Sequence, residues 1–247
     1  MHNPMSLDGK HILITGASSG IGRHCAIIVS RLGAKVTLLA RRADKLCETI
    51  SLMDSRQRHN MVVFDLENID CISDLISEIA LKHGPLDGFC HAAGLATVRP
   101  LKLSNNQFLD KIFRVNIYSF IELTRCLCSK KHLNNDASIV GISSVAAARG
   151  EIAQCAYAAS KAAMNGFLQP AAKELAQRGI RINTVSFAMV DTPMYQEFLN
   201  LGGNPSLVEK QCLGIIDVES AANAIAFLLS DACKYITGSV LPVHAGY

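Results

Sequence analysis

Long apolar runs and blocks of charge are both missing from this 247-residue sequence. No stretch of about 18 apolar residues occurs, so no membrane-spanning helix is expected. Lys and Arg total 24 against 21 Asp and Glu, for a net charge of +3, and they never form a block longer than a pair. Neither nucleic acid nor an anionic membrane is therefore expected as the main partner. The opening MHNPMSLDGK has no apolar segment, so no signal peptide is expected.

The sequence also lacks a metal-binding or disulfide framework. Its nine cysteines are scattered. The pair Cys126-Leu-Cys128 has the wrong spacing for a zinc knuckle, and no histidine cluster follows it. In a chain of this size, such cysteines indicate reduced thiols, so we expect a cytoplasmic protein without a metal site.

A sizeable core is available, because hydrophobic residues make up 49% of the sequence and charged residues 18%. No linker or internal repeat divides the chain, so we expect residues 1–247 to form a single domain. Apolar runs alternate with segments of helical spacing, which predicts a doubly wound, Rossmann-like, mostly seven-stranded parallel sheet with helices on both faces.

The expected strands lie at residues 10–15, 35–40, 61–64, 86–90, 137–142, 180–185 and 239–243. The expected helices lie at residues 23–32, 70–82, 106–132 and 218–229, with one more that carries Tyr157 and runs to Arg178. In that helix, Pro170 should produce a kink or remove one hydrogen bond, and Gly179 fits a C-cap. Residues 191–214, which include Pro193, Gly202, Gly203 and Pro205, are expected as an irregular substrate loop or lid.

A glycine-rich turn joins the first expected strand to the first expected helix. It reads Gly16-Ala-Ser-Ser-Gly20-Ile-Gly22. Glycines allow a tight turn and a close approach to a pyrophosphate, and a helix N-terminus offers free N–H groups. A plain strand-to-helix turn would look similar, but the flanking strand and helix favour dinucleotide binding.

The end of the second expected strand bears on the choice of nucleotide. An acidic residue there would select NAD by binding the ribose hydroxyls, but the sequence has Ala40 followed by Arg41 and Arg42. Two guanidinium groups can bind a 2′-phosphate, which favours NADP(H). The alternative is that both arginines form only the solvated start of the next helix.

Three side chains point to proton-transfer chemistry. Tyr157 and Lys161 are four residues apart, so a helix places them on one face. An ammonium group nearby would lower the pKa of the phenol from about 10 toward neutral pH. Ser144 follows an apolar strand, where its hydroxyl could hold a substrate oxygen. Taken alone, the Tyr157–Lys161 pair could equally be an ordinary surface pair.

Three further polar residues leave two interpretations each. Asp65 could accept a hydrogen bond from an adenine amino group, or it could cap the helix that starts near residue 68. His91 is expected to be a hydrogen-bonded structural histidine rather than a base. Asn116 lies in the apolar segment FRVNIYSF, so it either satisfies neighbouring backbone groups or belongs to a site.

Over essentially its whole length, the chain resembles the short-chain dehydrogenase/reductase family in its ordinary single-domain form. The matching motifs are Thr15-Gly-Ala-Ser-Ser-Gly-Ile-Gly22, Asp65, His91-Ala-Ala-Gly94, Asn116, Ser144, Tyr157-Ala-Ala-Ser-Lys161, Arg181-Ile-Asn-Thr-Val185 and Asp191-Thr-Pro-Met194. A complete Asn-Ser-Tyr-Lys set beside a glycine-rich turn, in the family's order, is a specific signal.

The resemblance implies four catalytic residues. Tyr157 would be the general acid in reduction and the general base in oxidation, while Lys161 would lower its pKa and bind the nicotinamide ribose. Ser144 would polarise the carbonyl, and Asn116 would hold a water molecule in a proton relay. The implied nucleotide-binding residues are Gly16, Ser18, Ser19, Gly20, Ile21, Gly22, Arg41, Arg42, Asp65, Leu66, Ala92, Gly94, Tyr157, Lys161, Val190 and Thr192.

The sequence departs from the family pattern at four places. The usual Asn-Asn-Ala-Gly reads His91-Ala-Ala-Gly94, and the usual Pro-Gly after the sixth strand reads Phe187-Ala188. The common Asp-Gly-Gly near the C-terminus reads His244-Ala-Gly246, and Pro170 lies in the helix that commonly builds the family's dimer interface. By resemblance, we expect a homotetramer or homodimer.

The resemblance implies an NADP(H)-dependent oxidoreductase of the class EC 1.1.1.-, which needs no metal. It would act on a ketone or secondary alcohol, with 3-oxoacyl or another small carbonyl compound as substrate. The motifs look most like those of 3-oxoacyl-acyl-carrier-protein reductases. Arg149 and Lys210 are either surface charges or contacts for an anionic substrate. The alternative function is a catalytically idle NADP(H)-binding partner subunit or sensor.

Overall fold

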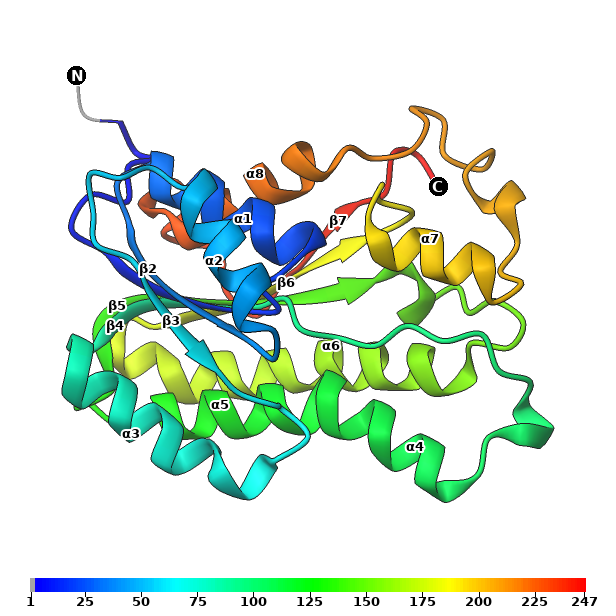
Figure 1. Cartoon of the computed structure of the whole chain (residues 1–247), viewed down its shortest axis with the longest axis horizontal. Helices are drawn as coiled ribbons and strands as arrows, with labels where there is room; N and C mark the ends of the chain where they lie inside the picture. Colours follow the sequence, from blue (N-terminus) through cyan, green and yellow to red (C-terminus); the bar gives the residue numbers. More distant parts are fainter. Residues whose placement is uncertain (1–2) are drawn as a thin grey trace.

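The computed structural model describes residues 3–247 and contains one parallel sheet with the strand order β3-β2-β1-β4-β5-β6-β7 (Figure 1). This is the doubly wound, Rossmann-like sheet that the sequence predicts. The seven strands are β1 (His11–Thr15), β2 (Lys35–Ala40), β3 (Asn60–Val63), β4 (Leu86–His91), β5 (Leu133–Ser144), β6 (Arg181–Phe187) and β7 (Val240–Val243).

The strand order creates a crevice above the middle of the sheet. From β1 the chain first adds β2 and β3 on one side, then returns to add β4 on the other side. Loops leaving the carboxyl ends of β1 and β4 therefore diverge. Open α/β sheets bind their ligands at such a point of reversal.

Helices cover both faces of the sheet. Figure 1 shows α1, α2 and α8 on one face, and α3, α4, α5 and α6 on the other. The helices are α1 (Gly20–Arg31), α2 (Ala43–Leu52), α3 (Ile72–His83), α4 (Asn106–Phe113), α5 (Ser119–Leu127), α6 (Cys155–Leu175), α7 (Pro193–Asn200) and α8 (Val218–Leu229). None of the helices described for residues 3–247 combines the length and apolar composition that a bilayer crossing requires.

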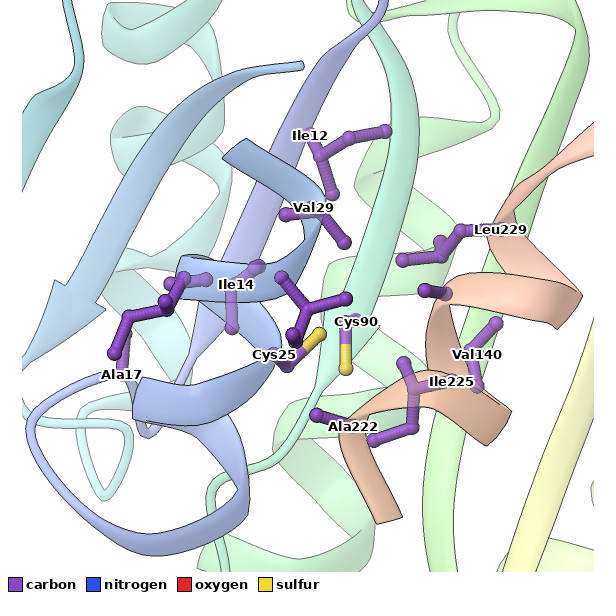
Figure 2. Close-up of a cluster of buried hydrophobic side chains, with 14 of the residues drawn as sticks. Ile12, Ile14, Ala17, Cys25, Val29, Cys90, Val140, Ala222, Ile225 and Leu229 are labelled. Carbon is purple, nitrogen blue, oxygen red and sulfur yellow. The ribbon is translucent and has the colours of Figure 1, made fainter. Parts of the chain in front are cut away.

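Each face of the sheet has its own hydrophobic core. In the core between the sheet and helices α1 and α8, Cys25 of α1 and Cys90 of β4 point toward each other, with Ile225 of α8 nearby (Figure 2). All five residues of β1 are buried, as expected for a central strand covered on both sides. The rigid sheet fixes where each strand delivers the loop that follows it.

The expected single helix at 106–132 is wrong in two respects. A π-helical turn at Arg114–Tyr118 separates α4 from α5, and α5 ends at Leu127, before β5 begins at Leu133. Asn116 lies within the π-helical turn, where its side chain bonds to Leu95. A π-helical turn widens the helix locally and is often found at functional sites.

The expected irregular segment at 191–214 contains the eight-residue helix α7 and a short 3-10 turn at Pro205–Leu207. Thr192 caps α7 by accepting a hydrogen bond from Tyr195 N at 3.2 Å, and Pro193 occupies the first helical position. After the helix, Gly202 has a φ of +86°, which ends it. The prolines and glycines therefore bound a helix rather than exclude one.

Helix α6 continues through Pro170, although this residue has no N–H to bond the carbonyl of residue 166. The helix ends at Leu175 and passes into a 3-10 turn at Ala176–Arg178. Gly179 follows with a φ of +67°, as the expected C-cap. Because α6 begins at Cys155, Tyr157 and Lys161 lie in its first two turns, beside the carboxyl end of β5.

Candidate active site

A cavity of about 460 Å³ opens at the carboxyl ends of the strands. All sixteen residues expected to bind a nucleotide line it, from Gly16 on the β1–α1 turn to Thr192 before α7. Ser144 also lines the cavity, but Asn116 does not. No group of three or more His, Cys, Asp or Glu side chains within residues 3–247 is arranged to hold a metal ion.

The glycine-rich turn forms a wall that only glycine permits. Gly16 has a φ of +65°, and a Cβ atom there would lie 2.7 Å from Ala93 N. A Cβ atom on Gly22 would lie 2.4 Å from Gly16 O. Helix α1 begins at Gly20 with no side chain capping its free N–H groups. Such a turn and helix start offer backbone donors to an anion such as a pyrophosphate.

The two arginines after β2 face this same end of the cavity. Arg41 Nη1 lies 3.7 Å from Asp65 Oδ2, and Arg42 Nη2 donates to Ser18 Oγ at 3.3 Å. Both partners of the Arg41–Asp65 pair are substantially exposed, so the pair is weak and leaves the guanidinium groups available. Asp65 does not cap a helix: its Oδ1 accepts from Glu67 N at 3.0 Å, and the helical segment starts at Ile69.

Ser144 and Tyr157 meet at the end of β5. Ser144 Oγ accepts from Ala146 N at 3.2 Å and thereby caps the turn at Val145–Ala147, so its O–H can donate to Tyr157 or to a substrate oxygen. Burial raises the pKa of Tyr157, and the hydrogen bond with Ser144 acts in the opposite direction. The tyrosine is therefore a neutral phenol near pH 7.

Lys161 lies deeper, 3% exposed, one helical turn from Tyr157. Its Nζ donates to Ile142 O at 2.6 Å and lies 5.8 Å from the centre of the Tyr157 ring. Burial lowers the pKa of Lys161 to about 8. The sequence-based expectation that Lys161 brings the pKa of Tyr157 below its ordinary value is thus wrong for this arrangement, because burial of the phenol dominates.

Asn116 lies outside the cavity and holds one of its wall residues, Leu95, in place. It is fully buried in the π-helical turn, where its Oδ1 accepts from Leu95 N at 2.7 Å and its Nδ2 donates to Leu95 O at 3.0 Å. Nδ2 also donates to Ser160 Oγ at 3.0 Å. Leu95 lines the cavity, so Asn116 fixes a wall segment that has no regular secondary structure of its own.

His91 is buried under the glycine-rich turn, as the structural interpretation of the sequence requires. Its Nδ1 is hydrogen-bonded to Thr15 Oγ1 at 3.1 Å, and its Nε2 lies 3.4 Å from Ser119 Oγ. Thr15 Oγ1 also accepts from Ala93 N at 3.2 Å. Burial, together with the nearby Lys161 charge, lowers the pKa of His91 to about 3, so the ring is neutral.

Gln211 joins the two ends of residues 190–216, which we call the α7 segment. Gln211 is 3% exposed. Its Oε1 accepts from Met189 N at 2.7 Å, while its Nε2 donates to Met189 O at 3.2 Å and to Gly214 O at 2.8 Å. Val190 and Ile216 pair alongside it. The base of the segment is therefore fixed, although no sequence motif marks this glutamine.

Tyr247 is not marked by a motif either, and it lines the cavity together with Arg149 and Glu151. The Tyr247 hydroxyl donates to Glu151 Oε1 at 2.8 Å across 96 residues of sequence. Backbone pairing of Leu213 N with Ala245 O at 3.0 Å holds the final residues against the α7 segment. Figure 1 shows this end of the chain beside α7. Only the folded structure brings these segments together.

The two residues at the Phe187-Ala188 departure are both nearly buried, with 3% and 9% exposure, and they line the cavity. Phe187 pairs with Val243 of β7 in the sheet. These two side chains add apolar surface at the base of the α7 segment.

Comparisons with known proteins place this architecture in a family. A model described as enoyl-(acyl carrier protein) reductase matches residues 16–247. A 3-oxoacyl-acyl-carrier-protein reductase of Rickettsia felis is 32% identical over 244 residues, which cover 98% of each chain. An L-xylulose reductase of Caenorhabditis elegans is 29% identical over 242 residues, covering 96% of this chain and 95% of the relative.

Solved structures agree with the sequence matches. A dehydrogenase/reductase from Sinorhizobium meliloti 1021 has a TM-score of 0.90 and 27% identity, and the match covers 98% of this chain and 96% of that one. A short-chain dehydrogenase/reductase from Serratia marcescens has a TM-score of 0.87 and 25% identity, covering 97% and 98%. The chain belongs to the short-chain dehydrogenase/reductase family of oxidoreductases.

Proposed function

We propose that this protein transfers a hydride between NADP(H) and a ketone or secondary alcohol, with a 3-oxoacyl compound or another small carbonyl compound as substrate. The observation that carries the proposal is the placement of Ser144, Tyr157 and Lys161 in one cavity with the glycine wall around Gly16. A nicotinamide nucleotide fits this cavity, because its wall has no room for side chains and a helix start offers donors to the phosphates.

The choice of NADP(H) over NAD(H) rests on the positive charge after β2. Arg41 and Arg42 face the cavity, and Arg42 already touches Ser18 of the glycine-rich turn. The single nearby acid, Asp65, is held by Glu67 N and Arg41. A 2′-phosphate can therefore meet two guanidinium groups, whereas no carboxylate ends β2 to bind a free ribose diol.

The nucleotide, when bound, supplies or accepts the hydride. The Ser144 O–H, beside Tyr157, can donate to the substrate oxygen. Tyr157 moves the proton at that oxygen, and the raised pKa of its phenol keeps it protonated for reduction. Lys161 supplies a buried positive charge beside the developing phenolate, and Ile142 O fixes its position. Asn116 keeps the Leu95 wall in place.

The substrate class is proposed from the relatives. Both named reductases would reduce a ketone, one of a 3-oxoacyl group and one of a sugar. The Ser144–Tyr157 pair would treat either carbonyl alike, so the difference must come from the α7 segment and the cavity end near Tyr247. We also propose a cytoplasmic location and a homotetramer or homodimer. Nine free cysteines support the cytoplasmic location, since thiols persist in reducing compartments.

The first test is a fluorescence titration of the protein with NADPH and with NADH, followed by a ketone screen. We expect tighter NADPH binding, and we expect Arg42→Ala to weaken NADPH binding about tenfold or more while changing NADH binding much less. Equal binding of both nucleotides by the native protein would contradict the NADP(H) proposal.

The second test separates an enzyme from an idle subunit. We expect Tyr157→Phe to bind NADPH normally and to lose ketone reduction that the native protein performs. If the native protein binds NADPH but reduces no ketone in the screen, and Tyr157→Phe behaves identically, the proposed enzyme function is wrong and the idle-partner alternative replaces it.

A further inference from the structure

Two cations flank the ring of Tyr247 at the open end of the cavity. The guanidinium carbon of Arg149 lies 5.5 Å from the ring centre, and Lys210 Nζ lies 5.8 Å from it. Glu151 completes the cluster: its Oε1 accepts from the Tyr247 hydroxyl at 2.8 Å and lies 3.4 Å from Lys210 Nζ. The cluster joins three segments that are distant in sequence.

The side-chain charges in this cluster do not cancel. Glu151 is engaged by both Lys210 and Tyr247, and burial together with Glu151 raises the pKa of Tyr247 to about 12. The tyrosine therefore stays a neutral donor at working pH. The side chains of the cluster are thus two cations and one carboxylate, and that carboxylate is already bonded to Lys210 and Tyr247.

Arg149 carries that excess charge. Within residues 3–247 it forms no ion pair, and its guanidinium group donates no hydrogen bond to protein. A cation–π contact at 5.5 Å is a weak restraint and leaves the five N–H donors of the group available. Its backbone is fixed, however, because Arg149 N donates to Val145 O at 2.9 Å.

Arg149 also lines the cavity that holds the proposed chemistry. It follows Ser144 by five residues, and the cavity wall includes Ser144, Tyr157 and Arg149. Met194, Glu197 and Phe198 of α7 line the same cavity. An arginine whose donors are free inside a cavity is suited to bind a carboxylate or phosphate, often in a bidentate manner.

We propose that Arg149 is a specificity-determining residue, which binds an anionic group of the carbonyl substrate. Glu151 and Tyr247 hold Lys210 away from that group, so a single guanidinium presents the charge. The substrate class becomes carbonyl compounds that bear a carboxylate or a phosphate. This inference rests on the proposed ketone reduction and adds the charge of the substrate to it.

The test uses pairs of substrates that differ in charge. One pair is 5-oxohexanoate and its methyl ester; the other is dihydroxyacetone phosphate and dihydroxyacetone. For each pair, the ratio of kcat/KM for the charged over the neutral member is measured with NADPH. We expect this ratio to exceed one for at least one pair in the native protein. The pair with the higher ratio shows whether Arg149 binds a carboxylate or a phosphate.

Two variants should move the ratio in opposite directions. Arg149→Gln should lower it about tenfold or more through KM, because a charge-assisted contact is lost. Glu151→Gln should raise it severalfold, because it removes the one carboxylate side chain of the cluster. Neutral substrates in both variants report any general damage to the site. The proposal would be overturned if the native protein gave a ratio below one for both substrate pairs. It would also be overturned if Arg149→Gln lowered kcat/KM equally for the charged and the neutral substrate.

A binding measurement separates this inference from the proposed function. Calorimetric titration of the native protein with 5-oxohexanoate, its ester, dihydroxyacetone phosphate and dihydroxyacetone requires no turnover. If none of the four is reduced but a charged member binds more tightly and Arg149→Gln abolishes the preference, ketone reduction of these compounds fails while the anion site stands. Equal binding within both pairs overturns the anion site whatever the turnover.

Discussion

The most direct test of the buried site concerns His91, whose replacement by Asn should make the protein less sensitive to acid. His91 has no exposed surface, and its pKa falls from 6.5 to about 3 on burial. Between these two pH values the unfolded chain binds a proton that the folded protein does not, so stability falls as the pH decreases through this range. Above pH 6.5 this loss is absent.

The magnitude follows from the difference in proton binding. At pH 5, which is 1.5 units below the ordinary pKa of 6.5, protonation favours the unfolded chain by about 2 kcal/mol. His11, with its pKa lowered to about 4, contributes a similar loss in both proteins. The loss between pH 7 and pH 5 should therefore be about 2 kcal/mol smaller in His91→Asn than in the native protein.

The assay is urea unfolding at both pH values, with the free energy extrapolated to water. Asparagine is chosen because it keeps a polar group near Thr15 and Ser119 but does not titrate. Any loss of packing lowers both values equally and cancels in the difference. If the two proteins lose the same stability between pH 7 and pH 5, within about 0.5 kcal/mol, His91 is not buried in its neutral form and the reasoning fails. A His11→Asn/His91→Asn double variant should remove about twice the effect.

Three further changes test other parts of the structure. Ala153 has a φ of +64°, so Ala153→Gly should raise the free energy of unfolding by about 0.5–1 kcal/mol in thermal unfolding, and a decrease would contradict the strain. Gln211→Met leaves Met189 N without its acceptor and should lower the free energy of unfolding by about 1–3 kcal/mol, with faster amide hydrogen exchange concentrated in residues 190–216. An equal rise in exchange over the whole protein would refute the role of Gln211 in holding this segment. The lowering of the Lys161 pKa from 10.5 to about 8 corresponds to about 3 kcal/mol of burial cost, so Lys161→Met should abolish ketone reduction yet be more stable at pH 7 in urea. Native stability should also rise between pH 8 and pH 10.5, where the unfolded chain holds the extra proton, and this rise should be missing in Lys161→Met.

The elements that the sequence predicted well are those with local signals. The strand at Lys35–Ala40 and the helix at Val218–Leu229 have the expected bounds, because apolar runs and helical spacing mark them within a few residues. The segment at 106–132 was predicted as one helix, since its periodicity is continuous. The π-helical turn inside it accompanies bonds from Asn116 to Leu95, a contact across 21 residues that periodicity does not contain.

In the site, too, local patterns were predicted and tertiary contacts were not. The glycine-rich turn and the Tyr157–Lys161 spacing are short patterns, and the structure places their residues in one cavity. Gln211 and Tyr247 carry no pattern, because their partners lie 22 and 96 residues away. Residues that act through a tertiary contact of this kind can be found only once the chain is folded.

Tyr157 shows why even a correct pattern did not give the chemistry. The spacing to Lys161 is helical, as predicted, but the effect of one charge on another group depends on burial as much as on distance. Lys161 directs its Nζ to Ile142 O, and both side chains lose hydration in the cavity, so the pKa of the phenol rises while that of the ammonium falls. A pre-formed phenolate would need a lowered tyrosine pKa, and the shift has the opposite direction. Tyr157 therefore stays a proton donor, whereas Lys161 loses its own proton near pH 8. At neutral pH the phenol is therefore protonated, a state that the spacing of the two residues does not predict.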